Sequence, residues 1–417
     1  MNSDDMNNKR PPAKLAEHKR RAANSGTLGR VLIYASEALL LIDSGRTTLD
    51  EVLDHAPDDS RRILEHLLLN IYRFRRSIRA SWEKFCRKKS SPEVAALLDT
   101  ALTQCRFQSA VVPYSVVNAA VDIARKLHAD KFVNAVLRAA LKEPFRYPST
   151  PGEILPEAIL RHWEKSFAPE QLEKFARLFI SHPEFTFRLC GNAVLPVNAR
   201  AVPAFAPFVF GSGNAANIIA SEEFARGAYY IQDPAAAMAI ALASGHVREC
   251  RSLLDLCAAP GGKTLMAAEL LKDDAEITAA DISARRQKLT AENFSRHRKK
   301  AQIITAEPAN ISGSFEWVIA DLPCSNTGVF RRRPDALWRF SGQAMTEVMA
   351  LQKHIIRQAA RLTAPGGWLL CSTCSIEAAE NDALAGELTG FTLVEKRTLL
   401  PDEQHDGAFA ALWQKVR

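Results

Sequence analysis

A chain of 417 residues with 47% apolar content exceeds the size at which one hydrophobic core keeps growing, so two or three globular domains are expected. Its 54 lysines and arginines against 47 acidic residues leave a net charge of +7, which suits a polyanionic partner. The eight cysteines lack disulfide spacing, the N-terminus lacks the apolar run of a secretory signal, and every apolar stretch is much shorter than the roughly 20 residues of a membrane span. These features exclude a disulfide scaffold and a membrane protein, and predict a cytoplasmic location.

The N-terminal part divides into a basic tail and a helical domain. Residues 1–25 are polar and basic, a composition typical of a disordered tail. In residues 26–146 apolar side chains recur at helical spacing, for example at Leu64, Leu68 and Ile71. We therefore expect an all-helical domain over this range.

The middle of the chain, residues 147–226, begins with a segment rich in proline and glycine and is expected to be a linker followed by a small α+β module. An amphipathic pattern over residues 158–179 predicts a helix. Short apolar runs at 185–189 and 208–210 predict strands.

The C-terminal part, residues 227–417, alternates strand-like apolar runs with helical stretches. The predicted strands are residues 253–256, 277–280, 302–305, 317–320 and 368–371, and the predicted helices lie near 264–272, 284–298 and 344–362. This alternation predicts a doubly wound α/β sheet, in which ligands bind at the carboxyl ends of the strands. Because the motifs of interest follow these strands, we expect them to meet in one cleft.

A glycine-rich turn from Cys257 to Lys263 follows the first of these strands and opens a helix, so its backbone can approach a ligand closely. Its end imitates a phosphate-binding P-loop, but that motif needs a glycine where Cys257 stands. A nucleoside ligand without phosphate fits better. Asp281 ends the next strand, where its carboxylate can accept hydrogen bonds from ribose hydroxyls or cap the following helix.

The segment Asp321-Leu-Pro-Cys324 matches in outline the site of amino-methyltransferases, but a cysteine stands where those enzymes stack a base on an aromatic ring. The cysteine indicates methylation at carbon. Carbon 5 of a pyrimidine is a poor nucleophile, so a thiolate must first add to carbon 6, and either Cys374 or Cys324 could supply it.

Cys374 lies at a predicted strand end before a predicted helix start, a position that favours the reactive thiolate. Together with Cys371 it also forms a C-x-x-C pair, the spacing of redox and zinc sites. Zinc would require a second such pair, which the sequence lacks. We interpret Cys371 and most other cysteines as small apolar core residues.

These motifs resemble those of the RsmB-type ribosomal RNA cytosine-5 methyltransferases, within the Nol/Nop/Sun group. The similar segments are Leu254 to Thr264, Asp321 to Trp338 and Ser372 to Asn381, which follow one another in the family's order. Phe132 to Arg138 is similar to a signature of the family's NusB-like RNA-binding domain. Tyr230 to Asp233 and Asp406 to Ala411 resemble the beginning and the last strand of its methyltransferase domain.

The resemblance implies a NusB-like all-α domain at 26–146 and a class I, Rossmann-like methyltransferase domain at 227–417. It implies that Cys374 is the nucleophile, that Cys324 assists release of the methylated base and that Asp321 contacts the cytosine ring. The implied cofactor is S-adenosylmethionine, held by Cys257, Ala258, Ala259, Pro260, Gly261, Gly262, Lys263, Asp281, Glu307 and Asp321. At position 307 the family usually has aspartate, so the longer Glu307 departs from its pattern.

The resemblance further implies small-subunit (16S) ribosomal RNA as the partner. We also expect a monomer that binds no metal and has no membrane contact. The neighbouring Arg331-Arg-Arg333 places guanidinium groups where they would suit RNA phosphates. Three alternatives remain open from the sequence. They are a tRNA cytosine-5 methyltransferase, an inactive RNA-binding or ribosome-assembly factor, and a thiol-redox enzyme that would need a reactive Cys371.

Overall fold

The computed structural model describes residues 27–417, so the predicted tail at residues 1–25 lies outside the described residues. The chain divides into two compact units. The first contains the residues up to Ile180 together with Arg333–Arg339, and the second contains Ser181–Arg332 and Phe340–Arg417. The segment 147–180, expected with the small module, thus groups with the helical domain.

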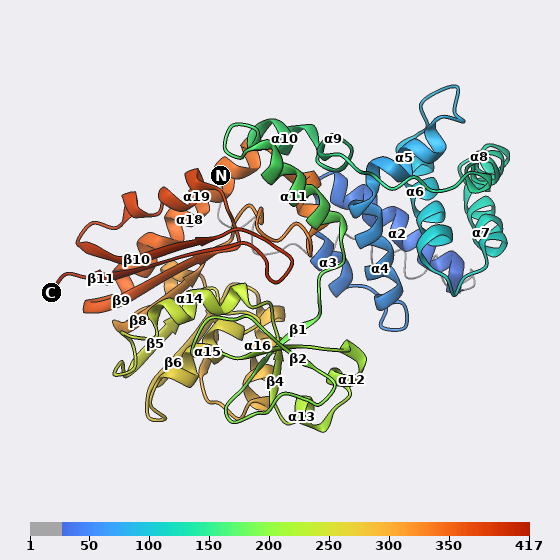
Figure 1. The fold of residues 1–417 in the computed structure, drawn as a ribbon. Coiled ribbons are helices and arrows are strands. Elements are labelled where there is room, and N and C mark those ends of the chain that lie inside the picture. Colours follow the sequence, from blue (N-terminus) through green and yellow to red (C-terminus); the bar gives the residue numbers. More distant parts are fainter. Residues whose placement is uncertain (1–26) are drawn as a thin grey trace. The chain divides into compact units, whose positions relative to one another are not determined.

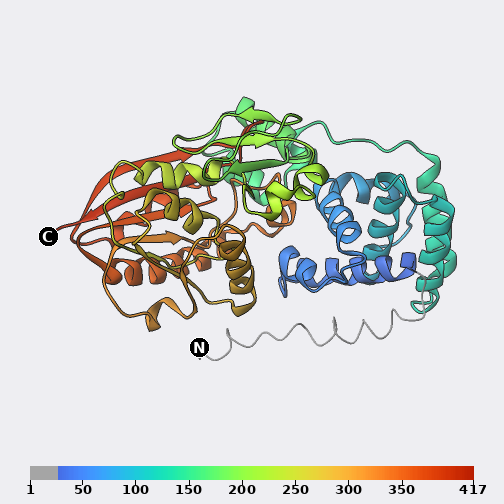
Figure 2. The same ribbon diagram turned by 90° about the horizontal axis from the view of Figure 1, so that it is seen from below.

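The first unit is helical, as predicted (Figures 1 and 2). Its helices are α2 (Thr27–Asp43), α3 (Leu49–Asp54), α4 (Arg61–Arg73), α5 (Arg75–Glu83), α6 (Pro92–Phe107), α7 (Pro113–Arg125), α8 (Asp130–Lys142), α9 (Pro151–Ile154), α10 (Glu157–Trp163), α11 (Pro169–Ile180) and α17 (Pro334–Arg339). Helix α6 packs against α2, α4, α7 and α8 and is buried along most of its length. Its N-terminus is fixed by Ser91, whose hydroxyl accepts a hydrogen bond from the Val94 N–H.

The single helix predicted for residues 158–179 is wrong, because two helices, α10 and α11, occupy this range. Pro169 starts the second helix, and proline is favoured in a first helical turn but disrupts a helix interior. The periodicity continues across the break because both helices bury aromatic residues in one cluster. The ring centroid of Trp163 lies 5.4 Å from that of Phe175.

Helix α17 comes from the C-terminal half of the sequence but packs against α4 of the helical unit. The indole N–H of Trp338 donates a hydrogen bond to the Tyr72 carbonyl at 2.7 Å. The guanidinium group of Arg75 lies 5.3 Å from the centroid of the same indole ring. Arg333 forms an ion pair with Asp50.

The second unit contains a small antiparallel sheet with the strand order β2-β3-β1-β4. The strands are β1 (Thr186–Leu189), β2 (Arg200–Val202), β3 (Phe210–Ser212) and β4 (Tyr229–Ile231), accompanied by α12 (Ala215–Ile219) and α13 (Glu222–Ala225). The strand predicted at 185–189 matches β1, whereas the one predicted at 208–210 overlaps β3 only at Phe210. The segment resembling the beginning of the methyltransferase domain contributes β4.

The larger sheet of this unit has the order β10-β11-β9-β8-β5-β6-β7. Its strands are β5 (Ser252–Asp255), β6 (Glu276–Asp281), β7 (Gln302–Thr305), β8 (Phe315–Asp321), β9 (Thr363–Thr373), β10 (Phe391–Leu399) and β11 (Ala408–Lys415). The strands from β9 to β7 pair in parallel, and β11 and β10 add antiparallel strands at one edge. The Rossmann-like fold is therefore confirmed, while β10 was not predicted.

Helices cover both faces of the larger sheet (Figure 1). Leu253, Ile319 and Leu370 share an apolar cluster with α14 (Ala235–Ala243) and α15 (Gly262–Leu270). The residues next to them along each strand, such as Leu254 and Val318, share a second cluster with α18 (Gly342–Leu362). The remaining elements are α16 (Ala284–Arg296), the 3-10 helices η3 (Pro308–Asn310) and η4 (Ala385–Glu387), and α19 (Ala378–Asp382).

Candidate active site

The predicted site residues meet at the carboxyl edge of the larger sheet. Asp281 is the last residue of β6, Asp321 is the last residue of β8, and Cys374 follows the end of β9 directly. In the sheet β9 lies beside β8, and β5 lies between β8 and β6. All four strands are parallel, so their carboxyl ends lie at the same edge. Topology thus brings together motifs that are far apart in the sequence.

The glycine-rich turn follows β5 and leads into α15. Gly261 has φ of +98°, a conformation that L side chains rarely adopt. A Cβ atom on Gly262 would lie 2.9 Å from the side-chain nitrogen of Gln232 and 3.0 Å from a ring carbon of Tyr230, so the turn leaves little room for a side chain at this position. The turn directs the unsatisfied N–H groups of the helix N-terminus towards the edge where the other motifs lie.

Asp281 is buried and already holds several donors. Its carboxylate accepts hydrogen bonds from the N–H groups of Ala259 at 3.3 Å and Ser283 at 2.8 Å, and from the Arg286 guanidinium at 2.9 Å. The helix cap that was an alternative role for Asp281 belongs to Ser283, whose hydroxyl accepts from the Arg286 N–H. Glu307 is exposed and follows β7, the neighbouring strand.

Asp255, at the end of β5, lies beneath the turn and is 1% exposed. It accepts hydrogen bonds from the Thr264 hydroxyl at 2.6 Å and the Cys257 N–H at 3.3 Å. Burial raises the pKa of Asp255 to about 7, well above its ordinary value of 3.8, and the nearby Asp321 adds to this effect. The fold therefore disfavours the ionised form of this carboxyl group.

This environment predicts a pH-dependent effect of Asp255→Asn. Because the pKa of Asp255 is higher in the folded chain than in the unfolded chain, the wild type loses stability as pH rises towards the folded pKa of about 7. Asparagine can accept from the Cys257 N–H through its oxygen and donate to the Thr264 hydroxyl through its nitrogen, and it does not ionise. Between about pH 6 and pH 8, the free energy of unfolding of the variant should rise by about 1 kcal/mol relative to wild type, measured by urea denaturation. A constant difference across this range would contradict the prediction.

Lys263 and Ser372 hold the carboxylate of Asp321. The lysine Nζ donates to one carboxylate oxygen at 2.7 Å, and the serine hydroxyl donates to the other at 2.7 Å. Burial opposes the charge on Lys263, but the ion pair with Asp321 outweighs it and raises the pKa of the ammonium group. Asp321 keeps 35% of its side chain exposed, so it remains open to a ligand.

The two thiols are adjacent. The Sγ atoms of Cys324 and Cys374 lie 3.0 Å apart, and the Cys374 thiol donates to Oδ1 of Asn326 at 3.2 Å. The side-chain nitrogen of Asn326 bonds back to the Cys324 carbonyl at 2.9 Å. Asn326 has φ of +61°, a left-handed conformation in which asparagine is over-represented among non-glycine residues.

The cysteines near the site differ in their environments, which change the pKa values of their thiols. The hydrogen bond with Cys374, together with burial, raises the pKa of Cys324 well above its ordinary value. Cys371 is fully buried in β9, and burial raises the pKa of its thiol strongly. This burial disfavours the thiol-redox alternative, which needs a reactive Cys371. Burial and the nearby Asp255 likewise raise the pKa of Cys257, an inert thiol at the start of the turn.

Backbone contacts lock the loop that carries Cys324 to the segment that carries Cys374. The Gly328 N–H donates to the Cys374 carbonyl at 2.9 Å, and the Gly407 N–H donates to the Gly328 carbonyl at 2.8 Å. A Cβ atom on Gly328 would lie 2.5 Å from the Gly407 carbonyl oxygen and 2.7 Å from that of Cys374. The close approach therefore requires glycine at position 328.

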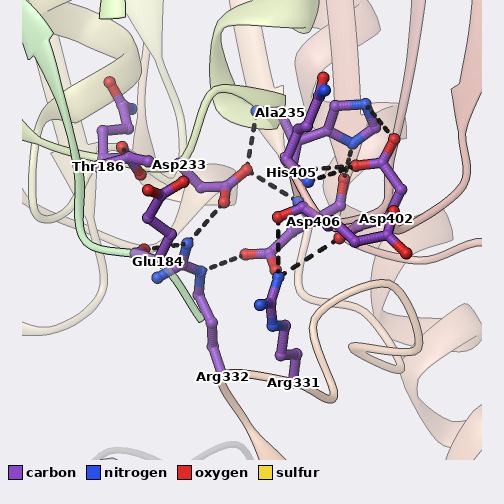
Figure 3. Close-up of polar contacts among 12 residues, drawn as sticks. Glu184, Thr186, Asp233, Ala235, Arg331, Arg332, Asp402, His405 and Asp406 are labelled. Atoms are coloured by element: carbon purple, nitrogen blue, oxygen red, sulfur yellow. Dashed lines mark hydrogen bonds and ion pairs between the residues drawn. The ribbon is translucent and has the colours of Figure 1, made fainter. Parts of the chain in front are cut away.

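The same loop continues into Arg331 and Arg332, whose guanidinium groups bind the protein itself (Figure 3). Arg332 donates to the carboxylates of Asp406 and Asp233, each at 2.7 Å. Arg331 donates to backbone carbonyls, including that of His182 at 2.8 Å. The prediction that these arginines are placed for RNA phosphates is therefore wrong for these two. They anchor the loop to the residues that precede α14 and β11.

Replacing Arg332 by alanine should destabilise this unit. It removes the guanidinium group that donates directly to the carboxylates of Asp233 and Asp406, which are 12% and 7% exposed. Because the guanidinium group is about a third exposed, we expect the free energy of unfolding to fall by about 2–3 kcal/mol, below the cost of breaking a fully buried pair. Urea denaturation measures the change. Arg331→Ala is the matched control, since it removes a donor from carbonyls and should cost less; equal losses would contradict this account.

Several residues at this edge were not predicted as site residues: Asp255, Asn326, Gln352, Ser372 and Glu380. Asp255, Asn326, Ser372 and Glu380 lie inside the motifs that carry the family resemblance, so their proximity in sequence to Cys257, Cys324 and Cys374 was the available signal. Gln352 lies in a helix with ordinary amphipathic periodicity, which gives no signal. Within residues 27–417, no helix is long and apolar enough to cross a membrane, and no cluster of potential ligands could hold a metal ion.

Comparisons with known proteins agree with this geometry. The model of the 16S rRNA methyltransferase RsmB/F family matches residues 241–412, and that of the NusB family matches residues 29–142. The probable ribosomal RNA small subunit methyltransferase B of Bacillus subtilis (strain 168) is 27% identical over 387 residues, which cover 84% of this chain and 85% of that protein. The corresponding protein of Xylella fastidiosa (strain Temecula1) is 29% identical, with coverage of 84% and 86%.

Two solved structures share the fold. The crystal structure of PH0851 has a TM-score of 0.72 at 22% identity and covers 94% of this chain and 99% of that one. The structure of NSun6 from Pyrococcus horikoshii with SFG has a TM-score of 0.51 at 16% identity, with coverage of 63% and 98%.

The Rossmann-like sheet, the glycine-rich turn and these matches define the chain as an RNA methyltransferase. More particularly, it carries a C-terminal domain that matches the RsmB/F methyltransferase family and, before it, a domain that matches the NusB family.

Proposed function

We propose that the protein transfers a methyl group from S-adenosylmethionine to carbon 5 of a cytosine in small-subunit (16S) ribosomal RNA, through a covalent adduct with Cys374. The observation that carries the proposal is the pair of thiols 3.0 Å apart at the carboxyl edge of the sheet, beside the carboxylate of Asp321. The names of the Bacillus and Xylella relatives support the ribosomal substrate.

The arrangement suits addition followed by elimination. The Cys374 thiol loses its proton to solvent and its sulfur adds to carbon 6, which makes carbon 5 nucleophilic. S-adenosylmethionine, when bound, supplies the methyl group as an electrophile. Cys324, after losing its own proton to solvent, then removes the proton from carbon 5, and the electron pair of that C–H bond expels Cys374 from carbon 6, which restores the aromatic ring and the free Cys374 thiolate.

The raised pKa of Cys324 explains the order of these steps. Its first cause is the neighbouring Cys374. Once Cys374 has become an uncharged thioether, this cause is removed, so Cys324 ionises more readily and can accept the proton. The neighbouring Cys374 thus prevents premature ionisation of Cys324.

The residues present fit an adenosyl cofactor. The N-terminus of α15 offers backbone donors. Asp281 ends β6 and Glu307 follows the neighbouring β7, so both can act as acceptors for hydroxyl or amino groups. Because Asp281 already accepts from Arg286, a ribose hydroxyl would displace that guanidinium group, which is half exposed and free to move away. Asp321, held by Lys263, is the carboxylate that would contact the cytosine ring.

The target cytosine must leave its base stack to reach these thiols. The unstacking costs a few kcal/mol and is smallest in a loop or single strand, so an unpaired cytosine of folded RNA is the expected target.

Methyl transfer from labelled S-adenosylmethionine to protein-free 16S rRNA and to bulk tRNA tests the proposal. We expect 5-methylcytosine in 16S rRNA, identified by mass spectrometry of nucleosides. Label in tRNA alone would keep the chemistry and overturn the substrate. Label in neither RNA would overturn the proposed activity and favour an RNA-binding assembly factor.

A further inference from the structure

A buried polar cluster lies behind the turn that carries Cys324. Its centre is the carboxylate of Glu380, which is 0% exposed and belongs to α19, just after the Cys374 segment. One carboxylate oxygen accepts from the Ser325 N–H at 3.1 Å and from the Gln352 side-chain amide at 2.7 Å. The other accepts from the Ser325 hydroxyl at 2.6 Å. The backbone N–H and the hydroxyl of Ser325, which follows Cys324, therefore both donate to the carboxylate of Glu380.

Gln352 holds the turn from the other side of Cys324. Its side-chain nitrogen donates to the Pro323 carbonyl at 2.8 Å as well as to Glu380. Because both partners are acceptors, the amide orientation is fixed, and its own oxygen is buried without a partner. Gln352 is 1% exposed and comes from α18.

The cluster thus forms hydrogen bonds with Pro323 and Ser325, the residues on both sides of Cys324. The sulfur of Cys324 faces that of Cys374. A buried carboxylate is costly unless its hydrogen bonds are satisfied, so the cluster has one well-defined arrangement. Cys374 itself is held through Asn326 and Gly328, and the cluster reaches its segment only through the Ser325 hydroxyl, which lies 3.0 Å from that of Ser375. Loss of the cluster should therefore displace Cys324 more than Cys374.

We propose that Glu380, together with Gln352, is a positioning residue for the release step, because it fixes the turn that aims the Cys324 thiol at the proton on carbon 5. This inference rests on the proposed function, in which Cys324 removes that proton. It predicts a specific defect: the adduct with Cys374 forms but is resolved slowly.

The test measures the covalent protein–RNA adduct on denaturing gels, with S-adenosylmethionine and 16S rRNA, in wild type, Cys324→Ala, Glu380→Ala and Glu380→Gln. Glu380→Ala should accumulate adduct as Cys324→Ala does, with turnover about 10–100-fold below wild type, as for a misplaced catalytic group. Glu380→Gln keeps an acceptor for the Ser325 N–H and a polar partner for its hydroxyl, so it should restore turnover to within about 5-fold of wild type. If Glu380 only stabilised the fold, Glu380→Ala would lower the rate of adduct formation as well as the rate of release, and adduct would not accumulate.

Two milder variants keep the test decisive if Glu380→Ala does not fold. Ser325→Ala removes one hydrogen bond to the carboxylate, and Gln352→Ala removes the bond to the Pro323 carbonyl. Each should raise the adduct above the wild-type level. If Cys324→Ala accumulates adduct and these variants stay at the wild-type level, the positioning role is wrong. If Cys324→Ala itself accumulates none, the release step of the proposed function is wrong.

Discussion

Replacing Cys374 by alanine should lower methyl transfer at least about 1000-fold, because no other thiol at this edge is placed to attack carbon 6. Cys324 lies 3.0 Å away, but its raised pKa keeps it protonated while Cys374 is free. Binding of S-adenosylmethionine should be retained, since the glycine-rich turn, Asp281 and Glu307 are untouched. Single-turnover methyl transfer and equilibrium binding of the cofactor measure the two effects separately.

Cys371→Ala is the matched control for this prediction. Cys371 lies three residues earlier in the same strand segment and is fully buried. Its loss should leave a small cavity and keep activity within a few-fold of wild type. An inactive Cys371→Ala variant with unchanged stability, or an active Cys374→Ala variant, would contradict the assignment of the nucleophile.

Gly328→Ala should lower turnover by about 100-fold or more, although residue 328 carries no reacting group. The new methyl group would meet the carbonyl oxygens of Gly407 and Cys374, which are backbone atoms and cannot move aside as a flexible side chain would. The segments bearing Cys324 and Cys374 must then separate, and a misplacement of about 1 Å is enough for a loss of this size. Steady-state kinetics on 16S rRNA, with thermal unfolding measured in parallel, tests this.

Gly342→Ala provides the comparison, since a Cβ atom there meets no atom within 4 Å and its φ is ordinary. We expect wild-type turnover from this variant. If Gly328→Ala retains near wild-type activity, the backbone lock between the two cysteine segments does not control catalysis.

The buried parts of the fold were the most predictable from sequence. The five strands predicted in the C-terminal domain all exist, because strands covered by helices on both faces have continuous apolar runs. Strand β10 was not predicted since most of its residues are exposed and charged residues interrupt its apolar pattern. The break between α10 and α11 was also not predicted. Both helices contribute aromatic residues to one cluster, so the apolar periodicity continues across Pro169.

Within the site, the motifs identified the residues that form its edge but not the contacts that hold them. The family resemblance pointed to Cys324, Cys374 and Asp321, and the topology brings all three together. The hydrogen bond of Gln352 to Glu380 joins residues on separate elements, so no local pattern reveals it. For Arg332 the charge suggested an RNA contact, whereas the carboxylates that bind it lie in distant segments of the chain.

The central claim is that Cys374 forms a covalent bond with the target cytosine, and trapping with RNA that contains 5-fluorocytidine tests it most directly. Fluorine at carbon 5 leaves no proton for Cys324 to remove, so the adduct should persist. Trypsin separates the thiols, because residues 362–396 contain Cys371 and Cys374 whereas residues 301–331 contain Cys324. We predict a nucleotide mass on the 362–396 peptide, localised to Cys374 by fragmentation and absent from Cys374→Ala. A nucleotide mass on the 301–331 peptide, or no adduct from an enzyme that methylates normal RNA, would contradict the account.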